Sequence, residues 1–229
     1  MHSHRDLQSG WARAAVFGVS DGLVSNVALV LGVAAASPDS SAVLVAGVAG
    51  LLAGSASMAA GEYVSMKAQA ELVERELDIE RRSIANQPRA ETRELSAIYA
   101  ERGIEQSQAD AMAKAVMADP EVALEVHARE ELGIDPADVG DPVAAAVSSF
   151  IAFGLGAIIP LIPWFLIDGA EATIASTVLG LGASALVGVV LSIFTERSKF
   201  RTAARQVGWA AGACLLTWLI GTWMGATIG

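Results

Sequence analysis

The chain has 229 residues, of which 53% are hydrophobic and 17% are charged, and its formal net charge is -10. Soluble domains carry roughly 25% charged residues, so this composition argues against an ordinary soluble protein and favours a membrane protein. The acidic balance argues against a nucleic-acid partner, because phosphate binding requires clustered lysine and arginine.

The charges are concentrated in one part of the chain. Residues 67–141 hold 18 of the 25 acidic and 9 of the 15 basic residues. The flanking stretches contain long runs that are almost free of charge, as expected of bilayer segments beside an aqueous one. The pattern predicts an all-α membrane protein with five transmembrane helices and a cytosolic three-helix acidic insert between the second and third. The expected domains are 1–66 (tail and helices 1–2), 67–141 (metal-binding insert) and 142–229 (helices 3–5).

The first two apolar segments cover about 11–36 and 42–66, separated by a turn at Ser37–Ser40. Each is long enough to cross a hydrocarbon core of about 30 Å. The stretch Tyr63–Arg82 contains no glycine or proline, so we expect one long helix that leaves the membrane and continues into water. In the insert, Gly133 is a predicted helix stop, and short amphipathic helices are expected at 88–101, 105–118 and 119–132.

The remaining spans are expected at about 142–167, 171–194 and 206–228, and the first of them is expected to bend at Pro160 and Pro163. Loop charge predicts their orientation. The 196–205 loop is basic and the tail contains Arg5, whereas the turns at 37–40 and 168–171 contain no base. The positive-inside rule then places the N-terminus and the insert in the cytosol and the C-terminus outside.

Ionisable and polar residues interrupt the first two spans. A carboxylate such as Asp21 costs about 3 kcal/mol at the centre of a spanning helix, so a cation, a proton or a wet cavity should accompany it, unless it lies at the hydrated interface. Asn26 is about one turn further and could share its site. In the second span Met58, Glu62 and Met66 follow i, i+4, i+8 spacing on one helix face, with Ser57 adjacent. A carboxylate with thioethers suits passage of a divalent transition metal, although methionine rows also serve packing.

The insert contains acidic residues at helical spacing, with one histidine among them. Oxygen-rich sites with one nitrogen suit Fe(II), Mn(II) or Zn(II), and the alternative is a solvated acidic surface. The candidate metal ligands are Glu76 and Glu80, Glu91 and Glu94, and His127 with Glu130 and Glu131. An enzyme is not expected, because the sequence has no glycine-rich nucleotide loop and no histidine pattern for a catalytic triad or a di-iron core.

Several motifs together resemble the vacuolar iron transporter (VIT) family, and the resemblance extends over nearly the whole chain. They are Ser20-Asp21-Gly22-Leu23, Ala53-Gly54-Ser55-Ala56-Ser57-Met58, Gly61-Glu62-Tyr63, Glu130-Glu131-Leu132-Gly133 and Ile159-Pro160-Leu161-Ile162-Pro163. The resemblance implies a dimer of five-helix protomers that exchanges cytosolic Fe(II), and to varying degrees other divalent ions, for protons. It also implies a path between the protomers that uses Asp21 and Met58.

The resemblance further implies that glutamates of the insert collect metal, at Glu80, Glu91, Glu94 and Glu131. The chain departs from plant members of the family at Ser83, at His127-Ala128, where they have two methionines, and at Gly50, where they have an acid. Glu62 stands where a plant relative has glycine. His127 and Glu130 are therefore expected as substitute ligands in a remodelled insert site.

These observations lead to one hypothesis and one alternative. The hypothesis is a bacterial-type, homodimeric, proton-coupled antiporter that exports Fe(II) or Mn(II) across the plasma (inner) membrane. It needs no bound cofactor, and Zn(II) and Co(II) are further candidate cargoes. The alternative is a membrane-anchored sensor or storage protein for divalent metals that does not transport them.

Overall fold

The computed structural model describes residues 10–37, 39–136 and 140–228, and every regular element in these ranges is a helix. The contacts divide the chain into two compact units. One comprises Met1–Val64 and Pro142–Gly229, and the other comprises Ser65–Asp141. Five helices are long and apolar enough to cross a membrane, and three short helices lie between the second and third of them, which confirms the predicted fold class.

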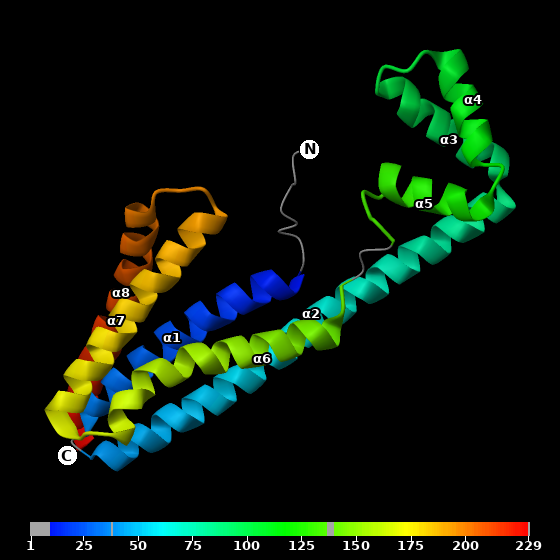
Figure 1. The fold of residues 1–229 in the computed structure, drawn as a ribbon. Coiled ribbons are helices and arrows are strands. Elements are labelled where there is room, and N and C mark those ends of the chain that lie inside the picture. The colour runs from blue at the N-terminus through cyan, green and yellow to red at the C-terminus, as the bar shows by residue number, and fades with distance from the viewer. Residues whose placement is uncertain (1–9, 38, 137–139, 229) are drawn as a thin grey trace. The chain divides into compact units, whose positions relative to one another are not determined.

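The first unit contains the long apolar helices. It is built from α1 (Gly10–Ala36), the first part of α2 (Ser40–Asn86), α6 (Pro142–Ile158), the 3-10 helix η1 (Ile159–Phe165), α7 (Gly169–Phe194) and α8 (Lys199–Ile228). Figure 1 shows α1 running beside α6, and α1 also contacts α7, α8 and η1. Because Val27, Val30 and Leu31 of α1 are almost fully buried, α1 is the central helix of this bundle.

Close helix contact in this unit depends on small residues. A Cβ atom at Gly22 would collide with the backbone carbonyl of Phe153, and one at Gly156 would collide with that of Val19. Glycine therefore lets the backbones of α1 and α6 approach each other directly, which is a common way of packing helices in lipid.

The third and fifth spans each depart from a single straight apolar helix. The bend predicted at Pro160 and Pro163 is present, because the α-helix gives way to the 3-10 helix η1 at Ile159. The predicted 196–205 loop is shorter than expected, because α8 begins at Lys199 and not at 206. Its first turns contain helix-forming Lys, Arg, Ala and Gln with no breaker, so the helix continues beyond its apolar segment. Arg5, used for the orientation, lies outside the described residues.

Helix α2 is continuous through both units. Asp39 accepts a hydrogen bond of 2.9 Å from the backbone N–H of Ser41 near its start, and no break follows before Asn86. Its 47 residues make a helix about 70 Å long, more than twice a hydrocarbon core. This confirms the prediction that one helix continues without a break from the second apolar segment into the charged stretch.

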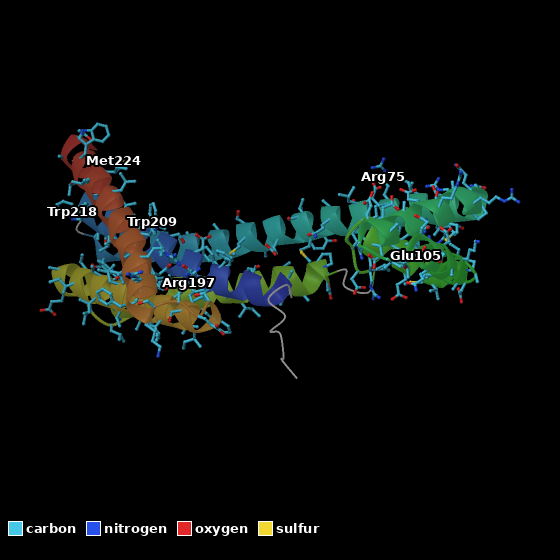
Figure 2. All side chains as sticks on the ribbon, turned by 90° about the horizontal axis from the view of Figure 1, so that it is seen from above. Arg75, Glu105, Arg197, Trp209, Trp218 and Met224 are labelled. Atoms are coloured by element: carbon cyan, nitrogen blue, oxygen red, sulfur yellow. The ribbon has the colours of Figure 1, made fainter. Side chains whose placement is uncertain are left out.

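The second unit contains the far part of α2 with α3 (Pro88–Glu101), α4 (Gln106–Val116) and α5 (Pro120–Glu130). Leu95 and Tyr99 of α3 pack against Ala109 and Ala113 of α4. In Figure 2, oxygen and nitrogen atoms are dense on the side chains around Arg75 and Glu105 of this unit, whereas Trp209, Trp218 and Met224 project from α8. These three α8 side chains are exposed, as expected of a surface that faces lipid.

Candidate functional site: a pocket between spanning helices and an acidic cluster

Within the first unit, residues of α1, α2 and α6 line an open pocket of about 310 Å³. It is lined by Asp21, Ser25, Asn26, Leu29, Gly50, Gly54, Ser57, Met58 and Phe153. Four of the residues selected from the sequence meet here, namely Asp21, Asn26, Ser57 and Met58. The lining combines a carboxylate, an amide, hydroxyls and a thioether. This mixture of hard and soft ligands suits divalent ions of the first transition series.

Asp21 lies on the open side of this pocket. Its side chain is exposed in the single chain, although it belongs to the candidate span Phe17–Ala36. The hydroxyl of Ser25, one turn further, donates a 2.6 Å hydrogen bond to the backbone carbonyl of Asp21. Ser25 was not selected from the sequence, although its i+4 spacing from Asp21 could have identified it.

The row of Met58, Glu62 and Met66 does not line a single site. Met58 lines the pocket, whereas Glu62 is half-buried one turn further along α2 and does not line it. Met66 belongs to the second unit, where its Cε methyl lies against Gly140. Of these three equally spaced residues, only Met58 lines the pocket. The other two do not, because α2 packs against different parts of the chain along its length.

In the second unit, Glu80, Glu91 and His127 form a cluster. Each offers a ligand atom, and these atoms all lie within 4.8 Å of one another. His127 Nδ1 is 3.2 Å from Glu80 Oε1 and 3.5 Å from Glu131 Oε2. The three cluster residues are buried, and the His127 side chain is completely so. Three converging ligands of this kind could hold a divalent metal ion.

Three helices supply this cluster, and local features fix their ends. Asp119 caps α5 by accepting hydrogen bonds from the backbone N–H groups of Glu121 and Val122. At the other end of α5, Gly133 adopts a φ of 65°, a left-handed conformation that glycine tolerates well. Ile84 of α2 packs against Ala123 and Leu124 of α5 and so sets the distance between the two helices that carry Glu80 and His127.

The electrostatics of the cluster favour a cation. Burial raises the pKa of Glu80 and of Glu91, and the Glu94 carboxylate raises the pKa of Glu91 further, while His127 opposes both shifts. Within the described residues, His127 Nε2 has no hydrogen-bond partner, and Glu80 Oε1 has only the charge contact with His127 Nδ1 and no well-aligned hydrogen bond. A buried carboxylate without a full set of partners is costly, so a bound divalent ion would relieve both the desolvation and the repulsion.

The other insert residues selected from the sequence occupy different positions. Glu131 lies at the edge of the cluster, and Glu94 is exposed but close enough to affect Glu91. Glu130 pairs with Arg102 instead, and Glu76 lies 3.4 Å from Arg75. Helical spacing could not distinguish the acids near the cluster from those paired with arginine. Both the arginine pairs and the meeting of α2, α3 and α5 form only when the unit folds.

Comparison with known proteins agrees with this architecture. The VIT family profile matches residues 12–222. The chain is 35% identical to vacuolar iron transporter 1 of Arabidopsis thaliana over 221 residues, which covers 93% of this chain and 88% of the relative. It is also 35% identical to vacuolar iron transporter 1 of Eucalyptus grandis over 192 residues, covering 83% and 77% of the two chains. The protein is a multi-pass membrane protein that belongs to the VIT family, whose members are transporters and not enzymes.

Proposed function

We propose that this protein is a proton-coupled antiporter that moves Fe(II) or Mn(II) out of the cytosol. The observation that carries the proposal is the pocket in which Asp21, Asn26, Ser57 and Met58 meet within candidate spans. An acid in a spanning helix is costly unless it serves an ion or a proton. The iron transporters to which the chain is similar support Fe(II) as a cargo.

In this proposal Asp21 is the carboxylate that exchanges metal for a proton. A metal that binds Asp21 displaces its proton, because a carboxylate must be ionised to act as a ligand. The Met58 thioether favours transition metals over Mg(II) and Ca(II), which prefer oxygen ligands. Glu62, one turn beyond Met58 on α2, is proposed as a second exchanging carboxylate, and Met66 as a further methionine along the same helix.

The insert is proposed to collect metal from the cytosol. Glu80, Glu91 and His127 are the proposed ligands, with Glu131 and Glu94 beside them. Because one nitrogen joins the carboxylates, the same site would also accept Zn(II) or Co(II). This unit would raise the amount of metal held near the protein without being the path itself.

A homodimer in the plasma membrane is part of the proposal. Asp21 is exposed in the single chain although it belongs to a candidate span, and a second copy against α1 and α2 would remove it from lipid. The insert and the basic start of α8 would face the cytosol by the positive-inside rule.

The test is uptake of Fe(II) and Mn(II) into inside-out membrane vesicles with an imposed proton gradient. The proposal predicts that a gradient with acid inside the vesicle drives metal uptake, and that collapsing the gradient with a protonophore stops it. Metal uptake that ignores the gradient would contradict proton coupling while leaving transport in place.

The same assay decides the second candidate, a membrane-anchored metal sensor or storage protein. The observation that favours it is the compact second unit with its own buried Glu80, Glu91 and His127 cluster. Metal that binds the vesicles in a fixed stoichiometric amount, with no accumulation under the gradient, would support this candidate and contradict the antiporter.

A further inference from the structure

Asn26 is a buried amide of which only one half is used. Its side chain is 2% exposed. Its Nδ2 donates a 2.7 Å hydrogen bond to the backbone carbonyl of Ala157, whereas its Oδ1 has no hydrogen-bond partner among the described residues. A carbonyl oxygen can only accept, so the NH2 group must face Ala157. The amide oxygen is therefore fixed in the opposite direction, and Asn26 lines the pocket together with Asp21 and Met58.

The break between α6 and η1 explains why a backbone carbonyl is available to Asn26. From Ile159 the chain follows 3-10 geometry, in which the carbonyl of residue i accepts from the N–H of residue i+3. For Ala157 that donor would be residue 160, which is a proline without an N–H. The side chain of Asn26 supplies a donor in its place.

A glycine on the facing helix lies next to this buried amide oxygen. A Cβ atom built at Gly50 would lie 2.4 Å from Leu29 Cδ2 and 3.1 Å from Asn26 Oδ1. Any side chain at position 50 would therefore fill the space in front of the oxygen. Both Gly50 and Leu29 line the same pocket.

We infer that Asn26 is a selectivity-determining residue whose Oδ1 is a neutral ligand for the metal ion in this pocket, and that the absence of a side chain at Gly50 keeps room for the ion beside that oxygen. The inference rests on the proposed transport function. A role confined to joining α1 and α6 would use Nδ2 alone and would leave a buried acceptor without a partner, which is unfavourable. A cation supplies the missing partner.

The position of the oxygen also gives the direction of the selectivity. Asn26 is almost completely removed from bulk water, so an ion must shed water on that side before it can bind. Mg(II) gives up its water reluctantly, whereas Fe(II) and Mn(II) bind readily to mixed protein ligands. An amide oxygen alone would suit Mg(II) as well, so the selectivity against Mg(II) comes from the dehydration that this dry side of the pocket requires.

Two variants test the inference in different ways. Asn26→Leu removes the oxygen and the hydrogen bond to Ala157, whereas Gly50→Ala keeps that bond and covers the oxygen. Gly182→Ala on α7 is the matched control, because a Cβ atom there meets nothing within 4 Å. The measurement is the initial rate of Fe(II) uptake into proteoliposomes at several Fe(II) concentrations, with and without excess Mg(II).

We expect both variants to raise the KM for Fe(II) by about tenfold or more, as loss of a ligand or of its support does at metal sites. Mg(II) should inhibit uptake more strongly in both variants than in the unaltered protein, and Gly182→Ala should resemble the unaltered protein. Gly50→Ala remains informative if Asn26→Leu does not fold, since its added methyl group meets a flexible leucine side chain.

An unchanged KM and unchanged Mg(II) inhibition in Gly50→Ala would overturn the inference, whatever Asn26→Leu does to the amount of folded protein. Asp21→Asn separates this result from failure of the proposed function. If Asp21→Asn abolishes uptake while Gly50→Ala has no effect, transport stands and only the role of Asn26 falls. If Asp21→Asn transports normally, the proposed function itself falls.

Discussion

At the scale of single residues, the insert cluster places two carboxylates and an imidazole where water is largely excluded. Burial raises the pKa of Glu91, so the folded protein holds a proton there at pH values at which an unfolded chain has released it. Glu91 therefore stabilises the metal-free insert below its ordinary pKa of about 4.5. That stabilisation is lost as the pH rises through the raised value.

Glu91→Gln should remove the contribution of Glu91 to the pH dependence of the stability of the metal-free insert. At pH 7 and with a chelator present, we expect residues 88–131 of the full-length variant to exchange backbone hydrogens more slowly than those of the unaltered protein, because no buried charge has to form. The variant should also bind Mn(II) about tenfold or more weakly. Glu74→Gln, an exposed acid on α2, is the control. Faster exchange in metal-free Glu91→Gln at pH 7 would contradict the interpretation of the cluster.

The sequence predicted candidate ligands but not their grouping. Asp21, Asn26 and Met58 could be selected because polar or soft side chains are unusual in spanning helices. Their meeting in one pocket, and the pairing of Glu130 with Arg102, depend on contacts between helices that no spacing along one helix encodes.

At the scale of helices, apolar length located the five spans well, because a bilayer imposes a minimum length that soluble folds do not. The start of α8 was predicted seven residues too late, since hydropathy reports where a helix enters lipid and not where its hydrogen bonding begins. The contact between α1 and α6 could not be predicted from the sequence either. The spans contain many glycines, and only some of them lie against the backbone of another helix.

Gly22→Ala tests that contact. Its added methyl group would collide with the backbone carbonyl of Phe153, which cannot move without displacing α6. We expect a loss of about 1–3 kcal/mol, seen as a lower thermal midpoint by size-exclusion chromatography of the detergent-solubilised protein. Gly182→Ala should leave the midpoint unchanged. Equal midpoints for the two variants would show that α1 and α6 are not in direct contact.

At the scale of the whole molecule, the proposed topology of five spans has the insert and the segment 195–198 in the cytosol and the turn at 166–168 outside. In a Cys214→Ser background, Glu105→Cys and Arg197→Cys should both react with a membrane-impermeant maleimide in inside-out vesicles and be protected in intact cells. Asp168→Cys should show the reverse pattern. Labelling of Glu105→Cys in intact cells would contradict a cytosolic insert.

We propose that the pocket lined by α1, α2 and α6 is the route by which metal and protons are exchanged. It is tested most directly by following Fe(II) uptake and proton release together in proteoliposomes that contain Asp21→Asn. Asp168→Asn, an exposed acid outside the pocket, is the control. We expect Asp21→Asn to lose both signals by tenfold or more and Asp168→Asn to keep both. Fe(II) uptake with normal proton release in Asp21→Asn would contradict it.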